Sequence, residues 1–345
     1  METFVELLHG GVDGLLEYLS AHVLTCLVPA FFIAGAIAVF ISQAAVLKYF
    51  GPQAKRVLSY SVASVSGSIL AVCSCTVLPL FGGIYTRGAG LGPAVAVLYS
   101  GPAINVLAIV YSARLLGYDM GAARAIGAIA FAAGIGLIMA SIYRKEEAQK
   151  DSEAFAMLGA DPEGTSLWQQ GVFFGTLVGI LVSAASKNWI ATGILLLILA
   201  IILWRWFTKG ELKLWMKETL HFVRLIAPWL LVGVFAAGII AVAVPESVVT
   251  SYVGGNRLLA NFIASFLGSL MYFATLTEVP IIRAFMDLGM GKGPALALLL
   301  AGPALSLPNM LVIRSILGTK KTLTYVALVV VMATFSGYIF GLVTQ

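Results

Sequence analysis

One stretch of this sequence occurs twice at a constant spacing. The stretch from Thr76 to Gly117 aligns without a gap on that from Thr277 to Gly318, an offset of 280 − 79 = 201 residues between the two prolines of the motif. The shared residues are mostly helix breakers: Gly88/Gly289, Gly90/Gly291, Gly92/Gly293, Pro93/Pro294, Gly101/Gly302 and Pro102/Pro303. Duplicated Gly/Pro interruptions inside apolar segments are typical of secondary transporters, whose substrate site forms where unwound membrane helices of two halves meet.

Composition places most of the chain in lipid. Hydrophobic residues make up 60% and charged residues 11%, with a mean hydropathy of +0.98, whereas soluble domains carry about 25% charged residues. Apolar runs long enough to cross a bilayer, about 20 residues each, lie at 24–47, 57–84, 93–115, 122–143, 167–185, 189–207, 226–244, 258–282, 294–316 and 323–343. We therefore predict an all-α, polytopic integral membrane protein with about ten transmembrane helices, an internal duplication and Gly/Pro-broken helices.

The net charge of +5 does not indicate a nucleic-acid partner. The basic residues stand singly or in pairs at the ends of the apolar runs, where snorkelling and membrane topology account for them. The first residues carry Glu2 and Glu6 and no Lys or Arg before the apolar run, which is unlike a secretory signal.

The predicted organisation has five parts. Residues 1–20 form an amphipathic interfacial helix, with Leu8, Val12 and Leu16 on one face. A first membrane repeat of four spans (21–143), a polar loop (144–166) and two linking spans (167–207) follow. The second repeat (208–345) opens with an amphipathic lead-in at 211–225 and continues with four spans.

Topology follows from counting these spans. Six spans separate equivalent points of the two copies, which predicts parallel copies, whereas one miscounted span would make them inverted. We expect the inner (plasma) membrane of a prokaryote. The polar loop opens with Arg144 and Lys145, so we expect it, and both termini, to be cytoplasmic.

Two thiols precede a proline in the first copy, in the order Cys73-Ser74-Cys75-Thr76-Val-Leu-Pro79. On a regular helix, residues i and i+2 point about 200° apart, so both thiols could bind one ion only where the backbone unwinds. Pro79 favours unwinding, because it removes an amide donor. Soft thiolates would prefer Cu(I), Zn(II) or trivalent arsenic. Cysteine also packs between membrane helices as a small apolar residue, so a purely structural pair is the alternative.

Glu278 is the acidic residue at the equivalent place of the second copy, in Thr277-Glu278-Val-Pro280. A carboxylate inside an apolar span is costly unless it is paired or faces water, and such residues are functional candidates by default. Glu278 could carry a coupling proton or neutralise a cationic substrate. The alternative is an ion pair with Arg283 or Arg87, although Asp287 is better spaced to pair with Arg283.

A third element is the turn Ser100-Gly101-Pro102-Ala-Ile-Asn105 and its copy, Gly302-Pro303-Ala-Leu-Ser306-Leu-Pro-Asn309. Each is expected to open a helix inside the membrane, where free amide donors and the positive dipole end can face an anion or a polar group. The Asn and Ser side chains are candidate liners, and interhelical hydrogen bonding is an equally good explanation for them.

With these motifs the chain resembles the YraQ/ArsP family of predicted permeases. The resemblance rests on the Cys73-to-Pro79 motif, Arg87-Gly88-Ala, the Ser100-to-Asn105 turn, and their echoes at Glu278-Val-Pro280 and Ala301-Gly302-Pro303. It implies export of organoarsenicals or other soft, toxic metals, and a role for Cys73 and Cys75 in binding a thiophilic substrate.

Our hypothesis is therefore a proton-coupled permease that exports a soft metal, metalloid or organometalloid species. It is not expected to be an enzyme or to need a cofactor, and its partners are the small substrate, protons and membrane lipid. The alternatives are a transporter of a small organic or anionic solute, a channel, or a structural membrane subunit. The predicted substrate-binding and translocation residues are Cys73, Ser74, Cys75, Thr76, Pro79, Gly101, Pro102, Asn105, Thr277, Glu278, Pro280, Gly302, Pro303, Ser306 and Asn309; Glu278 is also the predicted proton carrier, and Cys73 and Cys75 the ligands of a transported metal.

Overall fold

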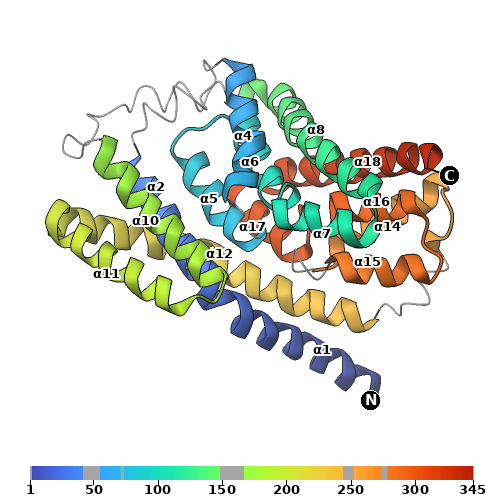
Figure 1. Cartoon of the computed structure of the whole chain (residues 1–345), viewed down its shortest axis with the longest axis horizontal. Helices are drawn as coiled ribbons and strands as arrows, with labels where there is room; N and C mark the ends of the chain where they lie inside the picture. Colours follow the sequence, from blue (N-terminus) through green and yellow to red (C-terminus); the bar gives the residue numbers. More distant parts are fainter. Residues whose placement is uncertain are drawn as a thin grey trace.

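The computed structural model describes residues 2–41, 55–70, 74–147, 167–243, 252–272 and 278–344 (Figure 1). Apart from one isolated β-bridge, the elements in these ranges are helical, as the apolar composition predicts. They are α1 (Glu2–Tyr18), η1 (Leu19–Leu27), α2 (Val28–Phe40), α4 (Arg56–Leu70), α5 (Ser74–Thr86), α6 (Leu91–Ala103), α7 (Val106–Leu116), α8 (Tyr118–Ile142), α10 (Leu167–Ala185), α11 (Trp189–Trp206), α12 (Lys209–Ala243), α14 (Leu258–Leu270), α15 (Glu278–Asp287), α16 (Lys292–Ala301), α17 (Leu307–Leu317) and α18 (Thr319–Val343).

The structure contains fewer full-length spans than the ten apolar runs suggest. Among the described residues, five helices are long and apolar enough to cross a membrane: α8, α10, α11, α12 and α18. The bent pair α6 and α7, whose axes differ by 47°, makes a sixth. The remaining apolar helices are shorter. The chain is thus a polytopic helical membrane protein in which Gly and Pro divide several apolar runs into half-length helices.

The run 258–282, expected to be one span, forms the hairpin-like pair α14 and α15. The backbone before α14 meets the backbone after α15 in an antiparallel bridge between Gly254 and Met290. The amide of Gly291 also donates to the carbonyl of Val253 at 3.3 Å. The chain therefore enters with α14 and returns with α15 on the same side. At 1.5 Å per residue, the 13 residues of α14 reach only about 20 Å into a hydrocarbon core of about 30 Å.

The run 57–84 is divided in the same way into α4 and α5. Tyr60, near the start of α4, lies against Gly92 at the start of α6. The hydroxyl of Ser100 donates to the carbonyl of Ala63 at 2.8 Å, so α4 runs parallel to α6. Because α5 leads directly into α6, the start of α4 and the end of α5 lie at the same end of α6. Both runs therefore fold back on themselves, as re-entrant pairs do, and neither forms one straight helix.

Equivalent helices of the two copies run antiparallel. Tyr143 at the end of α8 shares a hydrogen bond of 2.7 Å with Thr324 at the start of α18. Midway along both helices, the Cβ position of Gly134 lies 3.3 Å from Met332. Residue numbers rise along one helix as they fall along the other, so the expectation of parallel copies was wrong. Six spans were expected to separate equivalent points of the two copies. The run 258–282 lies between α8 and α18 and returns to its own side, so the number of crossings between equivalent points becomes odd. An odd number of crossings inverts one copy relative to the other.

Helix positions follow the spacing of the sequence motifs. The starts of α16, α17 and α18 at 292, 307 and 319 lie 201 residues after those of α6, α7 and α8 at 91, 106 and 118. Contacts between the copies also occur in pairs in which each residue of one contact is 201 positions from its equivalent in the other. Arg283 of α15 donates to the carbonyl of Leu115 in α7 at 3.4 Å, and the Cβ position of Gly82 in α5 lies 3.4 Å from Ile316 in α17. The five-part division of the chain itself remains a prediction.

Close glycine packing joins the helices within each copy. The Cβ position of Gly136 in α8 lies 2.6 Å from the carbonyl of Gly92 in α6, and that of Gly337 in α18 lies 2.5 Å from the carbonyl of Gly293 in α16. A side chain at these positions would collide with backbone. Small residues at helix contacts are characteristic of membrane bundles, because they allow backbones to approach closely.

The N-terminal helix packs along the apolar half of α12. Gly10 and Gly14 of α1 lie against Gly238 and its neighbours. The predicted apolar face of α1 points outward, with Val12 45% and Leu16 58% exposed, as in a helix whose apolar side contacts lipid. Its interfacial position stays a prediction.

The predicted amphipathic lead-in 211–225 is not a separate surface helix. It is the first part of α12, which continues without a break for 35 residues. Thr208 and Glu211 form a capping box at its start, with hydrogen bonds of 2.7 and 3.3 Å. Trp215 is buried and donates to the carbonyl of Phe32 in α2 at 2.8 Å.

The two linking spans lie at the edge of the bundle as α10 and α11 (Figure 1). Aromatic contacts attach them to α2 and α12. The ring centroids of Phe173 in α10 and Phe40 in α2 each lie 4.8 Å from that of Phe207, which follows α11, and that of Phe173 lies 5.5 Å from Trp215 in α12. The polar loop 144–166 is described only as far as Glu147, which is buried and pairs with Lys321 at 2.6 Å.

Candidate functional site

A buried ion pair joins the two copies at the centre of the bundle. Nη2 of Arg124 in α8 lies 3.3 Å from Oε2 of Glu278, the first residue of α15. The side chains are 0% and 1% exposed. Nη1 of Arg124 donates to the hydroxyl of Ser112 in α7 at 2.9 Å, and Ser112 donates to the carbonyl of Ala108 at 2.7 Å. The predicted site residue Glu278 is thus held by a cation from the other copy.

The partner of Glu278 differs from the two candidates that the sequence suggested. Arg283 instead pairs with Asp287, with Nη2 and Oδ1 3.0 Å apart in an exposed i,i+4 pair, which confirms the expected helix-end pair. Arg124 is the third residue of the apolar run 122–143 and did not stand out from it. An Arg inside a membrane span indicates a side chain that faces the bundle interior and pairs there, but the sequence does not say which residue is its partner.

The pair leaves several buried polar atoms without partners. Among the described residues, Oε1 of Glu278, Nε of Arg124, the hydroxyl of Ser306 and Oδ1 of Asn309 accept or donate no hydrogen bond. Ser306 and Asn309 are each 2% exposed. Buried polar groups in native proteins are normally satisfied, so each orphan atom calls for a ligand, a water or a second conformation.

The Gly302-Pro303 turn of the second copy lies beside this pair. The Cβ position of Gly302 is 3.7 Å from Oε1 of Glu278. Because glycine has no side chain, the backbone of the turn lies directly next to the carboxylate. Ser306 is the N-cap of α17 and makes no capping hydrogen bond through its side chain. The expected helix start inside the bundle is therefore present, with its hydroxyl free for another partner.

In the first copy the turn is arranged differently. Gly101 and Pro102 lie inside the last turn of α6 rather than opening a helix, and α7 begins after Asn105. Asn105 is buried, and its Oδ1 accepts from the amide of Ala108 at 3.5 Å. Pro303 follows α16 in the corresponding turn of the second copy and is buried.

Two buried tyrosines lie near the pair, and one of them joins the two copies. Tyr99 of α6 donates to the carbonyl of Leu300 in α16 at 2.9 Å. Residue 300 is the equivalent of residue 99 at the spacing of 201, so equivalent positions meet at this point, as they do near a two-fold axis. Tyr325, the equivalent of Arg124, donates to the carbonyl of Ala304 at 3.4 Å. Arg124, Glu278 and both phenols therefore gather near the contact between the copies.

The predicted thiol pair lies at the edge of the described residues. Cys73 and Thr277 lie outside the described residues, and for Ser74 and Cys75 the structure describes only the helical backbone at the start of α5. Thr76 is buried and Pro79 lies inside α5, whereas Pro280 is exposed in the first turn of α15. The described residues contain no group of three His, Cys, Asp or Glu side chains that could hold a metal ion.

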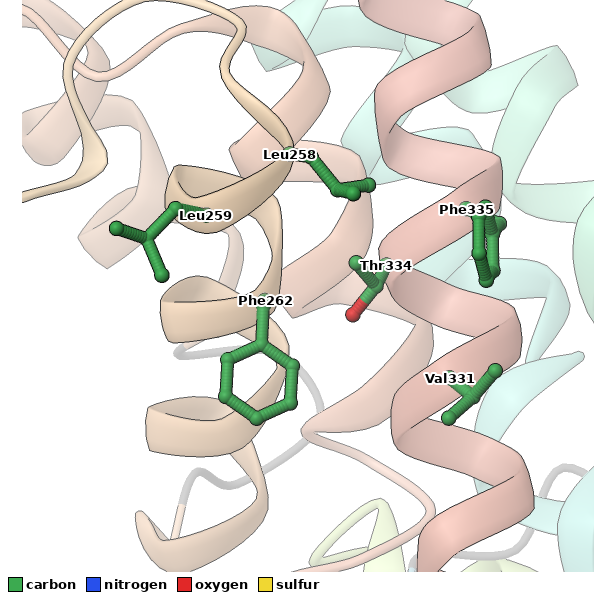
Figure 2. Close-up of a pocket in the computed structure, with 6 residues that line it drawn as sticks. All are labelled: Leu258, Leu259, Phe262, Val331, Thr334 and Phe335. Atoms are coloured by element: carbon green, nitrogen blue, oxygen red, sulfur yellow. The ribbon is translucent and has the colours of Figure 1, made fainter.

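Two apolar cavities open elsewhere in the described part of the chain. Figure 2 shows one of about 360 Å³ between α14 and α18, lined by Leu258, Leu259, Phe262, Val331, Thr334 and Phe335. The other, of about 370 Å³, lies between α2 and the α10–α11 hairpin. Neither is lined by a predicted site residue. Their apolar walls suit lipid chains rather than a charged or hydrogen-bonding substrate.

Comparison with known proteins adds a family. Residues 9–342 match the ArsP_1 family, described as a predicted permease. The UPF0718 protein MJ0584 of Methanocaldococcus jannaschii is 46% identical over an alignment of 363 residues, which covers 100% of this chain and 99% of that protein. The UPF0718 protein YraQ of Escherichia coli is 24% identical over 270 residues, 77% of this chain and 63% of YraQ. No solved structure matches this chain.

Proposed function

The chain belongs to the ArsP_1 family of predicted permeases, and on this premise we propose that it is a proton-coupled secondary transporter that exports a soft metal, metalloid or organometalloid species. Membership of a permease family makes it a multi-pass membrane transporter rather than an enzyme. The observation that carries the coupling part of the proposal is the buried pair of Arg124 and Glu278 between the copies.

The arrangement of the copies supports alternating access. The re-entrant pairs α4–α5 and α14–α15 enter from opposite sides, because the copies are inverted, and each carries a motif residue at the start of its returning helix. Inverted repeats with broken helices transport by rocking or gating of one half against the other. The duplication itself, which we propose as the origin of this arrangement, is supported by the shared offset of helix starts.

Glu278 is the proposed proton carrier. Its pairing with Arg124 stabilises the ionised carboxylate when the site is empty, and protonation would release it from α8. Since α8 and α15 belong to different copies, making and breaking this pair would couple proton binding to the relative position of the halves. Cys73 and Cys75 are the proposed contacts of the thiophilic substrate; their support is the chemistry of thiolates and the family resemblance.

Localisation in the inner (plasma) membrane of a prokaryote is part of the proposal. Its support is the occurrence of relatives in an archaeon and in Escherichia coli. The loop 144–166 and both termini were expected on the same, cytoplasmic side. Because the re-entrant pairs α4–α5 and α14–α15 each remove one crossing, three of the predicted crossings precede the loop and five follow it. We therefore propose that the loop, which opens with Arg144 and Lys145, is cytoplasmic and that both termini lie on the opposite side.

A second candidate cargo is a small anionic solute. It is favoured by Arg124, a buried cation with an unpartnered Nε, since Arg recognises oxyanions by charge-assisted hydrogen bonds. In this case the cysteine pair would only pack between helices.

The test is growth of an exporter-deficient bacterium on arsenite, methylarsenite, copper and zinc. Wild type is compared with Cys73→Ser/Cys75→Ser and Glu278→Gln at equal membrane levels, and Cys26→Ser is the matched control because Cys26 lies outside the motif in η1. We expect protection against one thiophilic compound, lost to the level of empty vector in the first two variants and kept in the control.

Protection that survives the double cysteine change, or no protection against any soft species, would contradict the proposed cargo. A channel is distinguished in proteoliposomes: collapse of the pH gradient stops concentrative transport by a coupled carrier, whereas it leaves passive flux through a channel intact.

A further inference from the structure

Arg124 is a permanent positive charge buried inside the bundle. Its side chain is 0% exposed, and a guanidinium cannot be deprotonated in a protein. Of its donors, Nη2 contacts Glu278 and Nη1 contacts Ser112, while Nε has no partner among the described residues. A buried cation of this kind needs a negative partner at every stage of a transport cycle.

Only one described carboxylate faces Arg124. The charged groups of its neighbouring elements are occupied elsewhere: Asp287 of α15 pairs with Arg283, and Asp119 of α8 pairs with Lys292 of α16 at 2.7 Å, both in exposed positions. Tyr99 of α6 and Tyr325 of α18 donate their hydroxyl groups to backbone carbonyls. Arg114, in the last turn of α7, is a further cation. If Glu278 takes up a proton, no described residue replaces its charge.

We propose that Arg124 is an anion-binding residue of the transport site, and that a small anion takes the place of the Glu278 carboxylate on its guanidinium when Glu278 is protonated. The inference rests on the proposed function and deepens it, because it states that one negative charge is loaded together with one proton. The proton goes from water to the Glu278 carboxylate, and the anion joins Arg124, so the buried charges sum to zero with the site empty or loaded.

The surroundings of the pair suit such an exchange. Protonated Glu278 becomes a hydrogen-bond donor, and its Oε1, which lacks a partner, faces the side of Gly302 where no Cβ blocks approach. Ser112 keeps one Nη of Arg124 in place, so the guanidinium can change partner on its other edge without losing its position. The unpartnered Nε lies on that guanidinium and offers a second donor to a bidentate anion.

The experiment uses full-length protein in lipid nanodiscs and isothermal titration calorimetry with sulfate, phosphate, nitrate, acetate and thiosulfate. Titrations in buffers of different protonation enthalpy count the protons taken up. For the wild type we expect binding of at least one anion with uptake of about one proton, and an affinity that falls about tenfold per pH unit above the titration of Glu278.

Glu278→Gln gives the sharpest prediction, because it removes the competing carboxylate and mimics the protonated state. We expect it to bind the same anion about tenfold more tightly or better at neutral pH, without proton uptake and without pH dependence. Glu278→Gln/Arg124→Gln, which removes both charges, should bind no anion. Arg283→Gln, an exposed arginine of the same helix as Glu278, should behave as wild type.

The outcomes separate the two proposals. Absence of anion binding in both wild type and Glu278→Gln, or binding that persists in the double variant, would overturn the role of Arg124. If resistance still depends on the cysteines and Glu278, the proposed function survives that failure. If no soft species is exported while Glu278→Gln binds an anion through Arg124, the cargo is wrong and the anion site stands.

Discussion

Arg124 and Glu278 lie 154 positions apart in the chain and form an ion pair whose side chains are 0% and 1% exposed. Two desolvated charges gain little over an apolar pair of similar volume, but either one alone is strongly destabilising. Their retention inside an apolar bundle therefore favours a functional role over a stabilising one.

Stability measurements can separate these contributions. Arg124→Leu should destabilise the protein by about 3–5 kcal/mol, because it leaves a buried carboxylate unpaired. Arg124→Leu/Glu278→Leu should recover most of this loss. The measurement is thermal unfolding in detergent followed by tryptophan fluorescence, with Arg283→Leu as an exposed control. A double variant less stable than Arg124→Leu would show that the pair itself stabilises the fold.

The half-length helices keep their places through glycine contacts with full-length neighbours. Gly337 lets α18 approach α16 at Gly293, and Asn261 of α14 lies in the same contact. The re-entrant helix α14 is therefore positioned by α16 and α18 together. In contrast, Gly171 and Gly175 of the peripheral helix α10 have nothing within 4 Å of their Cβ positions.

This difference predicts the effect of enlarging each glycine. Gly337→Leu should destabilise the protein by about 1–3 kcal/mol or more through overpacking and lower its transport activity, since α14 leads to the segment that carries Glu278. Gly175→Leu has open space and should stay close to wild type. The check is the yield and melting temperature of monodisperse protein, followed by the growth assay. Equal tolerance of both changes would contradict the close approach of α16 and α18.

The whole molecule is organised by inversion. The outer ends of the re-entrant pair α14–α15 are joined by the backbone bridge between Gly254 and Met290. Because α8 and α18 run antiparallel, the corresponding pair α4–α5 enters from the other side. A site between two such pairs can be reached from one side through one copy and from the other side through its equivalent, which is the geometry that alternating access requires.

Labelling of introduced cysteines tests this topology. In a variant with Cys26, Cys73 and Cys75 changed to Ala, cysteines placed at Tyr252 and Leu288, which are 61% and 59% exposed, should react with a membrane-impermeant maleimide from the same side. A cysteine at Val57, 82% exposed, should react from the opposite side. Labelling of 252 and 288 from opposite sides would restore the single-span reading of 258–282.

From the sequence alone, the membrane environment, the helical class, the doubled Gly/Pro pattern and the cost of placing the Glu278 carboxylate in an apolar run could be derived. These properties depend on composition and on local backbone chemistry: apolar runs require helices in lipid, Gly and Pro interrupt them, and a lone carboxylate in such a run is costly wherever it lies. The helix-end pair of Arg283 with Asp287 was predictable for the same reason, since its spacing is local.

Only the tertiary structure decided which apolar runs form one long helix and which fold back on themselves, and hence that equivalent helices of the two copies run antiparallel. Hydropathy measures the length of an apolar run but not whether its two ends are joined by a backbone contact such as that of Gly254 with Met290. The partner of Glu278 was equally beyond reach, because Arg124 meets it only through the packing of α8 against the other copy. Pairing across a fold depends on distances that the order of residues along the chain does not contain.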